Sequence, residues 1–271
     1  MTSLSFLLVM YLLSLVLSTT DRDSYLYLVG LEGCGHHGVT EFIKVIGKAC
    51  GESLYLDVTY EHPYTLRKAT LHRREKQFVT FVNGVREKQN TSMSLIDWRS
   101  FPFEGYRPDT PVAIKSVGLY DLDWIGRTAK KSGLKAKFLY LNRNTVDMVD
   151  SHQFDKTFEQ KIRLLHAMLE HIQNEAKIFT VSYPNSCHWA QTSFERFLGD
   201  PADVAKVVTS IINFFEWGRG DGVTLGESGC NISSAVEGII ARRRVPKLHT
   251  LSAAEKQFLD QFDWTINVPI L

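Results

Sequence analysis

The chain has 271 residues, of which 44% are hydrophobic and 23% are charged, and its formal net charge is +1 at pH 7. This length is enough for one large globular domain with a full hydrophobic core. The near-zero net charge gives no sign of a chain that is basic in bulk, as nucleic-acid binding would favour, so any binding of anions has to be local.

The first twenty residues differ from the rest, because residues 4–17 form an almost wholly apolar run. The run is too short to span a bilayer core comfortably and is typical of the hydrophobic region of a signal peptide. A short uncleaved membrane anchor through residues 4–18 is the alternative. Both interpretations predict that residues 21–271, read as a single domain, lie in the secretory pathway, in the Golgi lumen or outside the cell.

Two sequons agree with this location, Asn90-Thr91-Ser92 and Asn231-Ile232-Ser233, because N-glycosylation acceptors belong to secreted proteins. The chain also has four cysteines: Cys34, Cys50, Cys187 and Cys230. Pairing is expected in an oxidising compartment. We predict a Cys187–Cys230 bridge, since both residues lie near turns in the C-terminal part. A Cys34–Cys50 bridge is the alternative, and spacing alone does not decide between connectivities.

A glycine-rich turn follows the first apolar strand of the domain. Residues 26–29 predict that strand, Gly30 ends it, and residues 40–50 predict the next helix. Gly33, Gly35 and Gly38 lie between them. Glycines permit a tight turn, and a helix N-terminus offers unpaired N–H groups and partial positive charge, so this turn is typical of a phosphate site.

The loop departs from the phosphate-binding pattern G-x-x-x-x-G-K-[ST] of nucleotide hydrolases and kinases. Gly30 and Gly35 fit its spacing, but His36 replaces the Lys and His37 replaces the hydroxyl residue. The loop is therefore suited to holding a phosphate but poorly equipped for phosphoryl transfer.

Strands and helices alternate along the rest of the chain, which predicts a three-layer α/β sandwich with a central parallel sheet. Further strands are predicted at residues 53–58, 112–116, 137–141 and 178–181. Helices are predicted at 119–132, 156–176, 192–198, 201–217 and 252–262. Residues 61–110 are expected to form an insertion over the sheet edge, on the acceptor side, with a short strand at 78–82 and a hairpin signal at Asn83-Gly84.

Ligands of such a sheet bind at the carboxyl ends of the strands. Besides the glycine loop, two ends carry informative residues: Lys115 with Ser116, and Arg143. If a helix begins at Asn144 or Thr145, Ser151 lies about two turns along it. The Ser151 hydroxyl and the Arg143 guanidinium are then able to hold one phosphate between them.

This order of elements resembles the sulfotransferases that use 3′-phosphoadenylyl sulfate (PAPS). The match consists of a strand with a glycine-rich loop, a strand ending in Lys-Ser, and a strand ending in Arg-x7-Ser, with residues 137–155 matching best. Residues 181–183 and the Phe-Leu-Gly at 197–199 also resemble that family. The resemblance implies the P-loop-like sulfotransferase fold, PAPS as the donor, no required metal, and a carbohydrate or other hydroxyl as the acceptor.

The resemblance also implies roles for individual residues. Arg143 and Ser151 would hold the 3′-phosphate, and Lys115 would neutralise the bridging oxygen as sulfate leaves. The loop would hold the 5′-phosphosulfate through Gly33, Cys34, Gly35, His36, His37 and Gly38. His36 and His37 replace the usual hydroxyl residues there and would donate N–H bonds. For the general base, which needs to reach the acceptor hydroxyl, we favour Glu61, then His62, then Asp57.

Two other functions fit the same elements. A nucleotide-dependent kinase is one, with Asp57 at the end of a strand as a magnesium ligand, although the loop lacks the Lys. A non-catalytic nucleotide-binding protein on the same fold is the other, because the loop departs from the family pattern.

Overall fold

The computed structural model describes residues 23–31, 33–56, 71–87, 93–101, 122–150, 157–182, 187–218, 229–244 and 250–266. Within these ranges the strands form one sheet of order β2-β3-β1-β4-β5, and every neighbouring pair is parallel. The strands are β1 (Ser24–Leu31), β2 (Ser53–Leu56), β3 (Met93–Phe101), β4 (Lys135–Asn142) and β5 (Cys187–Ser193). The predicted α/β class with a central parallel sheet is confirmed.

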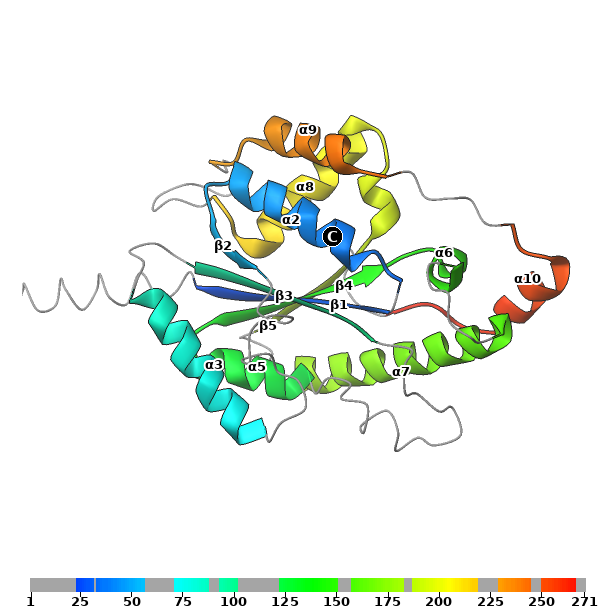
Figure 1. Ribbon diagram of the computed structural model, residues 1–271, viewed down its shortest axis with the longest axis horizontal. Coiled ribbons are helices and arrows are strands. Elements are labelled where there is room, and N and C mark those ends of the chain that lie inside the picture. The colour runs from blue at the N-terminus through cyan, green and yellow to red at the C-terminus, as the bar shows by residue number, and fades with distance from the viewer. Residues whose placement is uncertain are drawn as a thin grey trace, which may run out of the picture.

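Helices cover both faces of this sheet, as Figure 1 shows. One face carries α2 (His36–Ala49), α8 (Pro201–Phe215) and α9 (Ile232–Arg242), which contact one another. The other carries α3 (Leu71–Arg86), α5 (Leu122–Lys131) and α7 (Phe158–Ser182). Shorter helices follow β4 and β5, namely α6 (Thr145–Asp150) and the 3-10 helix η1 (Phe194–Phe197), and α10 (Ala253–Leu259) contacts α7.

The middle strand β1 is buried along its whole length. The ring centres of Tyr27 and Phe138 lie 5.8 Å apart, and those of Tyr25 and Phe78 lie 5.5 Å apart. A parallel strand with helices over both faces has no side that meets water, which explains its nearly continuous apolar sequence.

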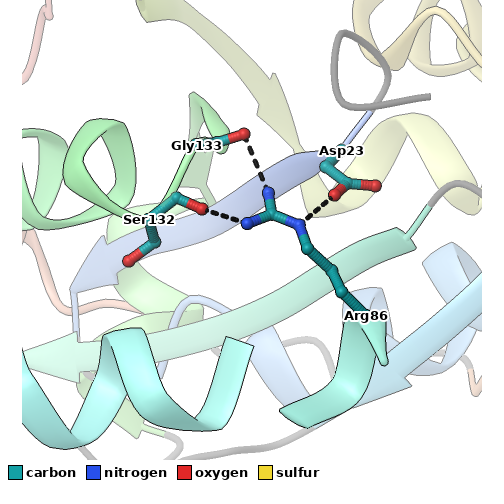
Figure 2. Close-up of polar contacts among 4 residues, drawn as sticks. All are labelled: Asp23, Arg86, Ser132 and Gly133. Carbon is teal, nitrogen blue, oxygen red and sulfur yellow. Dashed lines mark hydrogen bonds and ion pairs between the residues drawn. The ribbon is translucent and has the colours of Figure 1, made fainter. Parts of the chain in front are cut away.

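Arg86, the last residue of α3, fastens that helix to the amino edge of the sheet (Figure 2). Its Nε donates to Asp23 Oδ2 at 2.6 Å. Its Nη1 and Nη2 donate to the carbonyls of Ser132 and Gly133 at 2.6 and 3.0 Å. The Asp23 side chain, just before β1, is only 6% exposed. One guanidinium therefore joins α3 to the start of β1 and to the turn that enters β4.

The helix predicted at 119–132 ends where expected, because Gly133 follows α5 with a φ of 69°, the left-handed conformation that terminates helices. Two predicted helix starts also agree with the structure. Asn144 Oδ1 accepts from the backbone N–H of Val146 at the start of α6. Ser252 forms a capping box with Glu255 at the start of α10.

The disulfide joins Cys50 to Cys230, and this corrects both predicted pairings. The preferred Cys187–Cys230 bridge is wrong because Cys230 pairs with Cys50. The alternative Cys34–Cys50 bridge is wrong for the same reason, and Cys34 is buried as a thiol. The bonded residues are 180 positions apart in sequence and meet because α9 packs along α2. Cysteine spacing carries no sign of that packing.

Two predicted strands are wrong because both lie inside helices. Residues 78–82 belong to α3, together with Asn83 and Gly84 of the supposed hairpin, and residues 178–181 belong to the last turns of α7. Apolar runs this short fit a buried turn of helix as well as a strand. The likeness of residues 181–183 to a strand of the sulfotransferases is wrong for the same reason as the strand predicted at 178–181, since residues 181 and 182 are helical.

Two strands of the sheet were not predicted, β3 and β5. The former lies within residues 61–110, which we expected to form an edge insertion, yet it pairs with both β1 and β2 in the interior of the sheet. That part of the range is therefore central, not peripheral. Strand β5 occupies residues 187–193, so the helix predicted at 192–198 is reduced to the short η1.

Some predictions concern residues outside the described ranges. These include the apolar segment at 4–18, the strand at 112–116 and residues 61–70. Among the helices that the structure does describe, none is both long and apolar enough to cross a membrane.

Candidate functional site

The carboxyl ends of β1 and β4 lie side by side, because Gly30 pairs with Leu141 in the parallel register. The glycine loop follows the first of these strands and Arg143 follows the second. Two segments about 110 residues apart in sequence are thus neighbours at one edge of the sheet.

The loop turns through two glycines with positive φ, Gly33 at 85° and Gly35 at 86°. The N–H of Cys34 donates to the carbonyl of Leu31 at 2.9 Å, which closes the turn. Gly35 is the N-cap of α2, so no side chain caps this helix, and its first turn has no acidic residue. A helix start presents N–H groups and the positive end of the helix dipole, so this end of α2 is suited to an anion.

Most of the loop glycines make room for other side chains of the protein. A Cβ on Gly30 would collide with the Cys34 sulfur, and one on Gly35 would lie 2.7 Å from a ring carbon of Phe194. The same ring would lie 3.1 Å from a Cβ on Gly38. Phe194, the first residue of η1, thus packs directly on the start of α2.

Arg143 reaches the loop from the end of β4. Its Nη1 donates to the carbonyl oxygen of Gly33 at 2.9 Å. Its guanidinium carbon lies 5.3 Å from the centre of the Phe194 ring, a distance at which a cation is attracted to an aromatic face. Its Nε is buried and forms no hydrogen bond in the part of the chain that the structure describes.

Side-chain contacts hold the backbone on both sides of the guanidinium. The Arg143 N–H donates to Asn142 Oδ1 at 2.8 Å, and the Asn144 N–H donates to Glu195 Oε1 at 2.8 Å. Phe194 and Glu195 were both missed by the sequence analysis, because the strand that precedes them was not predicted. Had β5 been predicted, their position directly after its carboxyl end would have marked them as candidate site residues.

Cys34 in the loop and Tyr140 on β4 are both buried. Burial raises the pKa of the Tyr140 hydroxyl far above its usual range, and the nearby Cys34 thiol adds to the increase. The hydroxyl is therefore neutral at physiological pH. It places no negative charge near Cys34.

The structure brings Arg143 together with Gly33, and it places Cys34, Gly35, His37 and Gly38 in the same turn and helix start. The His37 side chain is exposed in the first turn of α2, whereas the structure does not describe the side chain of His36. The other predicted site residues also lie outside the described ranges: Asp57, Glu61, His62, Lys115 and Ser151. Their roles stay predictions.

In the described ranges, no group of three or more His, Cys, Asp and Glu side chains is placed to hold a metal ion. The expectation that the protein needs no metal stays a prediction as well.

No protein-family model and no curated protein matches the chain. Among solved structures, the chain is similar to a crystal structure of the mouse sulfotransferase SULT7A1 complexed with PAP. The sequence identity is 14% and the TM-score is 0.38, with 83% of this chain and 69% of that chain covered. A likeness this distant says nothing about activity.

Proposed function

We propose that the protein binds PAPS at the carboxyl edge of its sheet and transfers the sulfuryl group to a hydroxyl of a carbohydrate or another secretory-pathway acceptor. The contact between Arg143 Nη1 and the Gly33 carbonyl carries the proposal. It ties the guanidinium to a turn that opens an uncapped helix. Two sources of positive potential then act at one place, which favours a phosphate or sulfate group.

The groups around this point suit an anion. The Arg143 Nε is a buried donor without a hydrogen bond, and leaving a buried charged group unsatisfied costs about 1–3 kcal/mol or more. A phosphate oxygen beside it would remove that cost. The carboxylate of Glu195, next to Phe194, accepts from the Asn144 N–H, and the first turn of α2 has no carboxylate.

The chemistry is an in-line displacement at sulfur. The acceptor oxygen forms a bond to sulfur while the bond from sulfur to the 5′-phosphate oxygen breaks, and the electron pair leaves with that phosphate. The N–H groups at the start of α2 would stabilise the charge that develops there. Lys115 is predicted to assist at the bridging oxygen, and Glu61 or His62 is predicted to take the proton of the acceptor hydroxyl.

The disulfide supports the secretory part of the proposal. Disulfides persist in oxidising compartments and are rare in the cytosol, and Cys50–Cys230 joins two partly buried residues across 180 positions. The Golgi lumen or the cell exterior is consistent with such a bond.

Binding of 3′,5′-adenosine bisphosphate, the nucleotide product, tests the proposal by calorimetry. Arg143→Ala is expected to weaken binding by about 10- to 100-fold, the effect of losing a hydrogen bond to a charged group. Arg163→Ala is a matched control, because Arg163 on α7 also lies over a phenylalanine ring. Its guanidinium carbon is 5.2 Å from the centre of the Phe258 ring on α10. Equal affinities for the wild type and the Arg143 variant would refute the site.

Turnover separates the proposed enzyme from its two rivals. The proposal expects sulfate transfer from labelled PAPS to a panel of glycans. Binding of the bisphosphate without transfer to any acceptor would favour the non-catalytic binding protein. A magnesium-dependent thermal shift with ATP, and none with the bisphosphate, would favour the kinase.

A further inference from the structure

The start of α9 is a fixed and exposed corner of the molecule. Cys230 is bonded to Cys50 at the end of α2, and the N–H of Asn231 donates to the carbonyl of Ala49 at 2.9 Å. Asn231 and Ser233 are both exposed. The second sequon, Asn231-Ile232-Ser233, therefore lies on the surface, directly after a disulfide.

The Asn231 side chain has a structural role that uses only its oxygen. Oδ1 accepts from the backbone N–H of Ser234 at 3.0 Å and so caps α9. In N-glycosylation, Nδ2 bonds to the anomeric carbon of an oligosaccharide carried on a lipid diphosphate. The carbon–oxygen bond to the carrier breaks with its electrons on the diphosphate, and Nδ2 loses one proton to the transferase. Oδ1 is unchanged, so the cap and the glycan are compatible.

The sequon lies far from the candidate site. The glycine loop is at the N-terminus of α2, and Asn231 contacts Ala49 at its C-terminus. A helix of 14 residues is about 21 Å long. Figure 1 shows α9 running beside α2 on the same face of the sheet. A glycan at this corner would therefore leave the loop and Arg143 accessible.

We infer that Asn231 carries an N-linked glycan, attached to the amide nitrogen of a residue that at the same time caps α9. The inference needs the chain to reach the lumen of the secretory pathway, where the disulfide also forms. It shares that location with the proposed function but does not need the chain to bind PAPS or transfer sulfate, so a glycan without nucleotide binding, or the reverse, tells the two proposals apart.

The test uses the full chain made in cultured mammalian cells, with Asn90→Gln present throughout to remove the other sequon. Peptide N-glycosidase digestion in ¹⁸O-water is expected to shift the chain to higher mobility and to convert Asn231 to an ¹⁸O-labelled aspartate in the tryptic peptide of residues 220–242. Ser233→Ala leaves the asparagine in place but removes the hydroxyl that the sequon needs, and it is expected to abolish the shift.

Asn231→Asp is the matched second variant. It keeps an oxygen acceptor that caps helices well but has no amide nitrogen to modify. It is expected to lose the mobility shift, and its melting temperature should equal that of the deglycosylated parent, in which the digestion has already converted Asn231 to aspartate. An unshifted parent chain, or a shift that persists in either variant, would overturn the inference.

Discussion

Removing the disulfide between Cys50 and Cys230 is expected to lower the stability of the protein by several kcal/mol. The bond closes a loop across 180 residues. In the chain-entropy model, closing a loop of this length removes about 5 kcal/mol of conformational entropy from the unfolded state at 25 °C, and loss of a native disulfide costs about 2–5 kcal/mol in practice. For a domain of this size, each kcal/mol corresponds to roughly 2–4 °C in melting temperature. The upper value of about 5 kcal/mol therefore corresponds to a decrease in melting temperature of about 10–20 °C.

Thermal unfolding followed by circular dichroism measures this effect in the wild type and in the double variant Cys50→Ser/Cys230→Ser. A reductant is expected to lower the melting temperature of the wild type to that of the double variant and to leave the variant unchanged. Cys187→Ser is the discriminating control, because it should keep the full sensitivity to reductant. If Cys187→Ser removed that sensitivity and Cys50→Ser did not, the pairing described above would be wrong.

Two further substitutions test contacts at the two edges of the sheet, each by urea unfolding against a matched control. Gly35→Ala combines a strained φ of 86° with a steric clash, so it should destabilise by more than the roughly 1–2 kcal/mol of strain expected for Gly51→Ala, which has a φ of 70° and no neighbour within 4 Å; equal losses would contradict the clash. Arg86→Ala deprives the mostly buried Asp23 carboxylate of its guanidinium and should cost about 3–5 kcal/mol. Lys131→Ala, which removes an exposed ion pair with Glu75, should change stability by less than about 1 kcal/mol. An equally small effect for Arg86→Ala would argue that the pair between Arg86 and Asp23 does not behave as a buried one.

The elements that were predictable from sequence are those with the most uniform environment. Strand β4 was predicted at 137–141 and is found at Lys135–Asn142, because a strand between two others and under helices is apolar almost throughout. β5 pairs only with β4 in the described sheet and contains His188, Gln191 and Thr192, so its sequence lacks that signal. β3 contains Asp97 and Arg99, and these polar residues made an interior strand look like part of a polar insertion.

The candidate site was predictable where a residue follows directly from a strand end. Arg143 at the end of β4 was assigned to the same ligand as the glycine loop, and the two are in contact. Phe194 also follows a strand directly, but it was missed because the strand before it was assigned to residues 178–181. The disulfide was not predictable either, since it depends on how α9 packs on α2, a tertiary contact with no local pattern.

The glycines of the loop, although they drew attention to it first, are weaker evidence for a phosphate site than Arg143. Gly30 leaves space for the Cys34 sulfur, and Gly35 and Gly38 leave space for Phe194, so contacts within the protein account for three of them. Those contacts do not account for the buried Nε of Arg143 or for a helix start without a side-chain cap. A loss of nucleotide binding in Gly35→Ala would therefore be ambiguous, because repacking of the phenylalanine would produce it too. A loss of binding in Arg143→Ala at an unchanged melting temperature would be unambiguous, because the main change at the site is then the loss of a positive charge.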